Sequence, residues 1–487
     1  MPTRLLKAWL VLDENGEPCC DSVLSVDGRI ARTGWGLHDP SAETLEAGED
    51  AIITPGVVDS HMHIAGLTLQ RSGVDLRGSK SSVEIAGRLA RARGGIAYGR
   101  GWSEEEFNDE KDRLTRRLLD EHVPDRPAVA VRVCGHLAVA NTAALSIARP
   151  WERYPGLVDR SEGVLLEDAV SYTLEKLLGE APPTGEIRST LQALHDSGVQ
   201  AVSSMSCTQW EARGLETIES QAGGLPVKVS CYPDYDQLLG GGWEAPLGGR
   251  DWSIVGVKLY ADGSLGARTA FLSEPYTDDP GTRGLQLLDR GSLERRVREA
   301  TGRGLRVAVH AIGDAAIDTV AEAYASACGE PRTCRVEHAS LPSTASIRVF
   351  RAVQAGVAVQ PRFRVSDWWA VRRLGARRSH MLYPLRLLHH ALEGLVSYST
   401  DSPVEPFEPW KTVRAALGVD CAWQESCSPG WNVPLGSAIN AYTIVAALNS
   451  GGPASLLGSL EKGRPARLTG WTINGGGLPV SSWPVNL

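Results

Sequence analysis

Short apolar runs recur along the chain from residue 199 onward, and longer helix-forming stretches separate most of them. The runs are nearly continuous in Val, Ile, Leu and Ala, which is typical of parallel strands buried on both faces. We predict one strand that ends at His61 and seven more at 200–204, 227–232, 254–260, 306–310, 335–338, 357–360 and 396–400. Eight strands alternating with helices indicate a (β/α)₈ barrel, whose functional side chains lie at the C-terminal strand ends.

The segments outside this alternation of strands and helices indicate how the chain is divided into domains. Residues 1–55 contain strand-sized runs joined by Gly-containing turns. The tail 456–487 is rich in Gly, Pro and Ser, and we expect it to complete this N-terminal β domain. The barrel is expected at 56–455. Residues 64–198 interrupt the barrel as a long insertion after its first strand. Within the insertion we predict helices at 82–93, 110–121 and 190–197, and one strand at 128–133.

Composition and charge narrow the range of partners. The 58 acidic and 50 basic residues give a net charge of −8, which argues against nucleic acid or an anionic membrane as a partner. No apolar stretch approaches the roughly 20 residues of a membrane span, and the first residues are interpreted as a strand and a turn instead of a signal peptide. The nine cysteines are scattered without a CxxC pair, which favours a reducing, cytoplasmic setting.

Candidate metal ligands stand at the ends of the predicted barrel strands. His61 and His63 alternate along one strand and therefore point to the same side. His310, His338 and Asp401 each end a strand of their own. An isolated HxH pair is more often structural, and an Asp at this kind of position is a common turn former. At the ends of barrel strands the combination favours metal coordination, and imidazole suits Zn, Fe, Mn or Ni.

Lys258 lies within an apolar strand, where an ammonium ion is costly to bury. A neutral lysine amine can react with CO₂ to give a carbamate, whose carboxylate can bridge two cations. Two alternatives need no metal: the side chain extends to solvent, or it pairs with Asp262 or Asp314.

Several segments together resemble the amidohydrolase superfamily, in particular the amidohydrolase-3 branch with its N-substituted formamide deformylase-like hydrolases. The matching segments, in chain order, are TPGVVDSHMH, GVKLYADGSLGARTA, RVAVHAIGDAAIDTV, RVEHAS and STDSPVEPFEPW. The resemblance implies a TIM-like barrel, with a small β-sandwich built from both chain termini. Two positions depart from the family pattern: Cys134 and Arg467 each stand where an Asp is common.

The resemblance also implies a site with one or two divalent metal ions, which we expect to be zinc. His61, His63 and Asp401 would hold one ion, while the residues expected to complete a second position are His310, His338 and Lys258 as a bridging carbamate. The expected reaction is hydrolysis of a non-peptide C–N bond, in an amide, N-substituted formamide or cyclic amide. A metal-activated hydroxide would attack the carbonyl, and Asp401 would pass its proton to the leaving nitrogen.

Substrate contacts are expected from His136, Asp262, Arg268 and Trp368, although Arg268 could equally pair with an acidic neighbour. The Trp-containing loop around Trp368 suggests a small-molecule substrate with an apolar or aromatic N-substituent. Neither nucleic acid nor a membrane is expected as a partner, and a homodimer is compatible with the sequence.

Other functions fit parts of this pattern. A deaminase, a cyclic-amide hydrolase or an ester hydrolase could use the same metal site, because barrel enzymes change substrate through their loops. A non-catalytic binding protein would be favoured by loss of a ligand, and all six candidate positions are filled. A lyase that forms a Schiff base at Lys258 would leave the histidines and Asp401 without a role.

Overall fold

Two parallel sheets form the centre of the computed structural model, which describes residues 3–178, 184–420 and 431–487. The four-stranded sheet has the order β15-β14-β13-β6, and the five-stranded sheet has the order β16-β17-β18-β19-β20. Seven of the eight predicted barrel strands are present as single strands, whereas the run predicted at 254–260 is divided between β15 and β16, which belong to different sheets. The bounds are β6 (Val57–Met62), β13 (Val199–Met205), β14 (Lys228–Tyr232), β15 (Trp252–Ile254), β16 (Gly256–Tyr260), β17 (Arg306–Ala311), β18 (Cys334–His338), β19 (Gly356–Val359) and β20 (Val396–Tyr398).

Backbone hydrogen bonds join the two sheets at both of their edges. On one side the N–H of Lys258, in the edge strand β16, donates to the carbonyl oxygen of Pro233, directly after β14, at 2.8 Å. At the other edge the Asp401 N–H donates to the His61 carbonyl oxygen, also at 2.8 Å. The candidate ligands at these strand ends are therefore held on a connected backbone framework.

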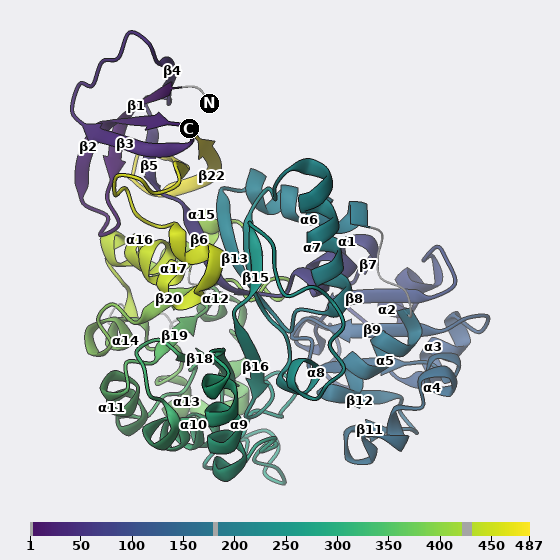
Figure 1. Cartoon of the computed structure of the whole chain (residues 1–487). Coiled ribbons are helices and arrows are strands. Elements are labelled where there is room, and N and C mark those ends of the chain that lie inside the picture. Colours follow the sequence, from purple (N-terminus) through teal and green to yellow (C-terminus); the bar gives the residue numbers. More distant parts are fainter. Residues whose placement is uncertain (1–2, 179–183, 421–430) are drawn as a thin grey trace.

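Helices cover the outer faces of these strands (Figure 1). Val257, Val309 and Val336 share one buried cluster with Leu293 and Ile317 of the covering helices. None of the described helices is both long and apolar enough to cross a membrane. The described α-helices after residue 183 are α6 (Thr184–Asp196), which ends the predicted insertion, and then α7 (Gln209–Ala222), α8 (Tyr235–Leu239), α9 (Arg290–Gly302), α10 (Asp314–Ala327), α11 (Thr344–Ala352), α12 (Phe363–Ser366), α13 (Ala370–Ser379), α14 (Leu385–Ala391), α15 (Pro409–Ala416), α16 (Leu435–Tyr442) and α17 (Ile444–Ser450).

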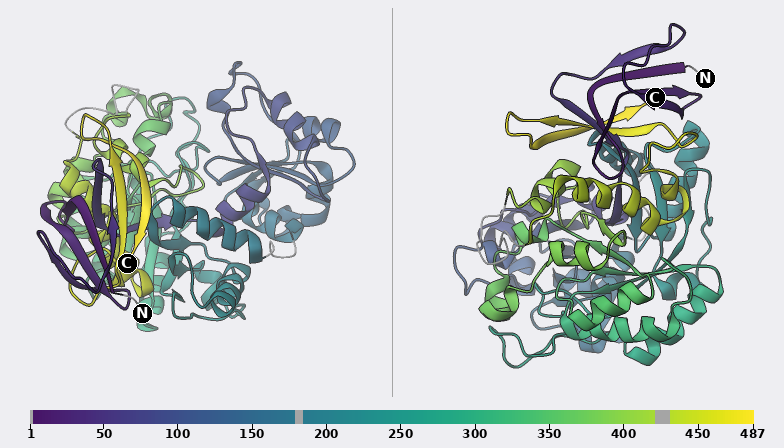
Figure 2. Two further views of the ribbon diagram at one scale, coloured as in Figure 1. Left: turned by 90° about the horizontal axis from the view of Figure 1, so that it is seen from above. Right: turned by 90° about the vertical axis from the view of Figure 1, so that its left-hand side faces the viewer.

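Both chain ends contribute to one seven-stranded sheet beside the central strands (Figures 1 and 2). Strand β21 pairs antiparallel with β5, and β22 pairs antiparallel with β21. Arg467, the unusual residue of the tail, begins β21 and donates a hydrogen bond to the Pro226 carbonyl oxygen at 2.9 Å. The strands of this sheet are β1 (Thr3–Leu12), β2 (Pro18–Val26), β3 (Arg29–Gly34), β4 (Glu43–Glu46), β5 (Ala51–Pro55), β21 (Arg467–Ile473) and β22 (Pro479–Asn486).

The predicted insertion contains a six-stranded sheet of its own, of which the sequence analysis expected only the strand at 128–133. Strand β8 was not predicted because it contains two glycines, which are rare in strands. The fold requires both of them: a Cβ at Gly99 would lie 2.9 Å from Leu76 side-chain atoms, and Gly101 has a φ of +110°. The helix predicted at 110–121 begins only at Arg116. The elements are α1 (Ile64–Ser72), β7 (Val74–Asp75), α2 (Ser82–Ala90), β8 (Ala97–Trp102), α3 (Arg116–His122), β9 (Ala128–Arg132), β10 (Leu137–Ala140), α4 (Thr142–Ala148), β11 (Val158–Asp159), β12 (Val164–Leu166) and α5 (Asp168–Leu178).

Two of the nine cysteines form a disulfide that the sequence analysis did not anticipate. It joins Cys328, directly after α10, to Cys334 at the start of β18. The bond therefore closes the short connection between a covering helix and a central strand. The thiols of Cys134, Cys207 and Cys231 are free.

Candidate active site

The candidate metal ligands meet at the C-terminal ends of the central strands. The Nε2 atoms of His61 and His63 both lie 3.2 Å from Oδ1 of Asp401. Potential ligand atoms of His61, His338 and Asp401 all lie within 4.8 Å of one another, and all three residues are buried. The ring centroid of His310 lies 4.5 Å from that of His338. The structure thus brings together side chains that are as much as 340 positions apart, from His61 to Asp401.

Lys258 points into the same region and has only 1% of its surface exposed. Its Nζ has no hydrogen-bond partner among the residues that the structure describes, and it lies 5.0 Å from the ring centroid of Tyr260. Burial lowers the pKa of Lys258 to about 8. Neither alternative from the sequence describes this lysine, since it does not reach solvent and forms no ion pair with Asp262 or Asp314.

The donor set fits a divalent cation such as zinc. Three buried polar atoms, His61 Nε2, Lys258 Nζ and Asp401 Oδ1, lack a hydrogen-bond partner in the described part of the chain. Buried polar atoms are rarely left without a partner, because the loss of their hydration is costly. Imidazole nitrogens and carboxylate oxygens are ordinary zinc ligands. A cation between them would satisfy His61 and Asp401, whereas Lys258 would have to be neutral or carboxylated to join them.

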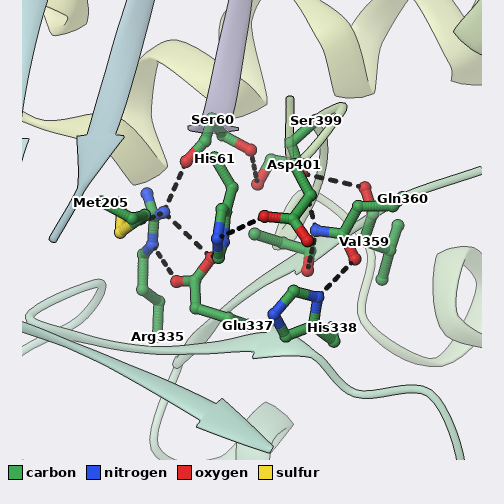
Figure 3. A network of polar contacts seen from close by, with 12 residues as sticks. Ser60, His61, Met205, Arg335, Glu337, His338, Val359, Gln360, Ser399 and Asp401 are labelled. Carbon is green, nitrogen blue, oxygen red and sulfur yellow. Dashed lines mark hydrogen bonds and ion pairs between the residues drawn. The ribbon is translucent and has the colours of Figure 1, made fainter. Parts of the chain in front are cut away.

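A buried carboxylate orients His61 (Figure 3). Oε2 of Glu337 lies 2.5 Å from His61 Nδ1, and Oε1 of Glu337 accepts a hydrogen bond from Arg335 at 2.5 Å. Burial acts to raise the pKa of Glu337, but the charge of Arg335 holds this pKa well below its usual range. With Nδ1–H donated to Glu337, Nε2 of His61 is free to act as a ligand. The sequence analysis did not identify Glu337, although it lies inside the RVEHAS segment.

The other histidines are oriented in the same manner. Nδ1 of His338 lies 2.8 Å from Oε1 of Gln360, and Nδ1 of His63 lies 3.0 Å from the Met205 carbonyl oxygen. In His310 the two nitrogens exchange roles, because Nε2 lies 3.0 Å from the Gly263 carbonyl oxygen. His338 departs from strand alternation through a φ of +70°, which turns its side chain toward the centre.

A cavity of about 240 Å³ opens onto three of the candidate ligands, His310, His338 and Asp401. Its wall combines the insertion with loops that follow the central strands, and it includes Cys134, His136, Leu265, His310, His338, Phe363, Trp368, Trp369, Tyr383 and Asp401. His136 and Trp368, two of the predicted substrate contacts, therefore lie at the wall of this cavity. In His136, burial acts to lower the pKa, but the Glu167 carboxylate, 2.5 Å from Nδ1, raises it to about 9.

The other two predicted substrate contacts do not line this cavity. Asp262 is fully buried and accepts backbone hydrogen bonds from Phe271, Ile312 and Gly313 at 2.9, 3.1 and 2.8 Å. Its carboxylate therefore fixes two loops instead of facing substrate. Arg268 pairs with Asp278 at 2.8 Å, as the alternative interpretation stated.

Comparisons with known proteins agree with this geometry. The sequence model of the amidohydrolase family, in its amidohydrolase-3 branch, matches residues 48–476. Over 463 residues the chain is 29% identical to the putative amidohydrolase YtcJ of Bacillus subtilis (strain 168), covering 87% of this chain and 84% of that protein. It is 24% identical over 481 residues to the N-substituted formamide deformylase of Arthrobacter pascens, covering 89% and 86%.

A solved structure shows the same arrangement over nearly the whole chain. The crystal structure of an uncharacterized metal-dependent hydrolase from Pyrococcus horikoshii OT3 matches with a TM-score of 0.78 and 30% sequence identity. The match covers 97% of this chain and 98% of that one. The family implies a divalent metal and a small-molecule substrate. The chain therefore belongs to the amidohydrolase family, in its amidohydrolase-3 branch, and is a metal-dependent hydrolase.

Proposed function

We propose that this enzyme hydrolyses a non-peptide C–N bond in an uncharged amide, N-substituted formamide or cyclic amide. The observation that carries the proposal is the convergence of buried His61 Nε2, Lys258 Nζ and Asp401 Oδ1, which have no hydrogen-bond partner among the described residues. The proposed ligands are His61, His63, Lys258 as a carbamate, His310, His338 and Asp401, with one or two zinc ions per chain. The similarity to an N-substituted formamide deformylase supports the choice of bond.

The proposed scaffold is a (β/α)₈ barrel at 56–455 with its insertion at 64–198. Hydrogen bonds between the two parallel sheets at both edges support a closed ring of strands. Residues 1–55 and 456–487 are proposed to form one small β-sandwich, which the pairing of β21 with β5 supports.

The roles of the side chains follow from their contacts. When bound, a divalent metal supplies an acidified water molecule and polarises a carbonyl oxygen. Glu337, Gln360 and the Met205 carbonyl oxygen hold three imidazoles in fixed orientations. Asp401 lies at the cavity wall and keeps an ionised carboxylate, because the neighbouring histidines hold its pKa well below the usual range against the effect of burial. It can therefore accept the proton of the attacking water and deliver it to the leaving nitrogen.

The charged side chains of the cavity wall support an uncharged substrate. Outside the proposed ligands, each of them already has a partner within the protein: Arg77 with Asp75, Glu106 with Lys80, Arg132 with Glu104, Glu405 with Arg362, Glu105 with Arg373, His136 with Glu167, and Asp367 with the Tyr383 hydroxyl. A substrate carboxylate would need a free cationic group for compensation. Phe363, Trp368 and Trp369 offer apolar area for an N-substituent instead.

Metal content and hydrolysis measured together test this proposal. Protein purified without added metal should contain one or two zinc ions per chain and should hydrolyse N-benzylformamide to benzylamine and formate. Lys258→Ala should lose metal, and Asp401→Asn should lose activity by about 100-fold or more. Arg268→Gln is the matched control, because Arg268 lies outside the cavity. A protein that takes up no metal on reconstitution would contradict the proposal, and release of ammonia from amino-substituted rings would indicate a deaminase.

A further inference from the structure

A second cluster of metal-binding side chains lies outside the active-site cavity. Potential ligand atoms of Cys207, Glu211 and Cys231, the two Sγ atoms and a carboxylate oxygen, all lie within 4.8 Å of one another. All three residues are fully buried, and none of them lines the cavity. Cys207 follows the end of β13, Glu211 belongs to the first turn of α7, and Cys231 lies in β14. The fold therefore gathers ligand groups from three elements at a place that the hydrolytic centre does not use.

Hydrogen bonds hold the members of this cluster in place. Ser204 lies opposite Cys231 in the parallel pairing of β13 with β14. The Ser204 hydroxyl donates to Oε1 of Glu211 at 2.6 Å, and the Ala65 N–H in the first turn of α1 donates to Oε2 at 3.1 Å. The carboxylate is therefore directed at the two cysteines by contacts with both a strand and a second helix.

The charge of Glu211 is not compensated. This carboxylate forms no ion pair in the described part of the chain, whereas the equally buried Glu337 is paired with Arg335. Its surroundings are apolar, since Ile64 and Leu215 belong to the same buried cluster as both cysteines. Burial raises the pKa of Glu211 to about 7, although its hydrogen-bond donors act to lower it. A buried carboxylate without a cation is costly, and a bound metal ion would supply the missing charge.

The ligand types at this cluster favour zinc. Thiolate and carboxylate are both ordinary zinc ligands, whereas Mg²⁺ and Ca²⁺ prefer oxygen alone. Two thiolates and one carboxylate carry three negative charges, so a divalent ion leaves one uncompensated and Cu⁺ would leave two. The N-terminal ends of α1 and α7, which Glu211 contacts and belongs to, respectively, offset part of the remainder. The Thr208 carbonyl oxygen, 3.7 Å from Cys207 Sγ, can complete a fourfold set of ligands.

We propose that Cys207, Glu211 and Cys231 form a structural site for a single zinc ion, separate from the hydrolytic centre. The proposal goes beyond the proposed function, because none of the three residues is among the ligands proposed for hydrolysis. Both thiols release their protons to solvent as the ion binds. Because all three side chains are fully buried, the ion enters while the chain folds.

An ion at this cluster would hold two segments that place His63. Ala65, whose N–H contacts Glu211, is two positions after His63. Met205, whose carbonyl oxygen lies 3.0 Å from His63 Nδ1, is two positions before Cys207. The ion would thus fix the backbone on both sides of a proposed ligand of the hydrolytic centre without touching that ligand.

Cobalt substitution tests the proposal, since a thiolate bound to Co²⁺ gives an intense charge-transfer band in the near ultraviolet. Protein produced in medium with Co²⁺ in place of Zn²⁺ should show this band and keep it on dialysis against EDTA, because the site is buried. The double variant Cys207→Ser/Cys231→Ser should lose the band together with about one cobalt ion per chain. Glu211→Gln should lose the band during dialysis, because it lacks the third ligand.

Two control variants separate this site from the hydrolytic centre, whose proposed ligands contain no sulfur. Cys134→Ser removes the thiol at the cavity wall and should keep the band. Lys258→Ala, which should release metal from the hydrolytic centre, should also keep it. The band therefore remains informative in an enzyme that cleaves no amide, a result that would count against the proposed function alone.

Four results would overturn the proposal: a wild type without the band, a band that persists in the double variant, a Glu211→Gln protein that retains the band as the wild type does, or a disulfide between Cys207 and Cys231 in the purified protein. ¹¹³Cd NMR on the wild type covers the case in which the double variant does not fold. A resonance shifted far downfield, as thiolate ligands produce, is expected beside those of nitrogen and oxygen ligands. The absence of this resonance would reject the site.

Discussion

The carboxylate of Glu337 lies 2.5 Å from His61 Nδ1, on the opposite side of the imidazole from Asp401 (Figure 3). Both side chains are fully buried, and Arg335 holds the carboxylate from its other side. Because the carboxylate accepts the Nδ1 proton, His61 is fixed in the tautomer whose Nε2 lies 3.2 Å from Asp401 Oδ1. The orientation of His61, a proposed ligand, therefore depends on a residue outside the proposed ligand set.

Glu337→Gln should weaken metal binding without removing a ligand. A neutral amide can donate to His61 as well as accept from it, so the tautomer is no longer imposed, and we expect the dissociation constant to rise by about 10- to 100-fold. Competition with a chromogenic chelator measures this constant. Glu330→Gln is the control, because Glu330 lies on the connection between α10 and β18 and is exposed. Equal metal affinity in wild type and Glu337→Gln would contradict the role of this carboxylate.

Gly263→Ala should destabilise the protein and slow catalysis together. The new Cβ would lie 2.1 Å from Glu167 Oε1 and 2.2 Å from Thr269 Oγ1, so both side chains must move. Overpacking of this kind costs about 1–3 kcal/mol, which thermal or urea unfolding can detect. Gly242→Ala is the matched control, since its Cβ would meet nothing within 4 Å. A Gly263→Ala protein with wild-type stability and kcat would show that this contact is easily relieved.

Asp251 should contribute stability that depends on pH. Its carboxylate accepts hydrogen bonds from Lys228 Nζ at 2.8 Å and from the Leu225 N–H at 3.0 Å. Burial acts to raise the pKa of Asp251, but these donors lower it from 3.8 to about 2. Since the pKa is lower in the folded protein, the contribution is complete above about pH 4 and is lost as the pH falls toward 2.

Asp251→Asn should therefore lower the free energy of unfolding by about 1–3 kcal/mol at pH 7. Urea unfolding of both proteins between pH 7 and pH 3 should show the difference shrinking below about pH 4. A difference that stays constant over this range would mean that packing, not charge, accounts for the loss.

The central strands and the side chains that meet at their ends could be predicted from the sequence, because the local apolar pattern and the position in the fold agree there. Val307 and Val309 belong to an uninterrupted apolar run, and His310 ends it, so the strand and its functional end are both visible in the sequence. Strand β16 is visible in the sequence for a related reason, because Lys258 is the one charged residue within its apolar run. Strands that are buried on both faces have nearly continuous hydrophobic sequences, which can be recognised without the structure.

The remaining features depend on contacts between distant segments. Strands β7 and β11 have two residues each, which is too short to leave a pattern. Glu337 and Glu167 acquire their roles from His61 and His136, which lie 276 and 31 positions away in the chain. Asp262 was expected to face substrate, but its acceptors are filled by backbone N–H groups of loops that only the fold brings near. A carboxylate in a loop has the same sequence signature in either role.

Trp368→Ala should change substrate selectivity without affecting the chemical step. Trp368 lines the cavity with 45% of its surface still exposed, and the Arg372 guanidinium carbon lies 5.4 Å from the ring centroid. Because protein atoms cover only part of the ring, a bound N-substituent can pack against the rest. The apolar area buried in this way would strengthen substrate binding by roughly 1–2 kcal/mol. The variant should therefore raise KM for N-benzylformamide by about tenfold while KM for N-methylformamide, too small to reach the ring, stays within about twofold.

Steady-state kinetics on both substrates supply the comparison. Trp35→Ala is the control, because it removes an indole of 62% exposure beside the sheet that both chain ends form. Equal effects of Trp368→Ala on the two substrates would indicate that this side chain shapes the loop and not the binding of the N-substituent.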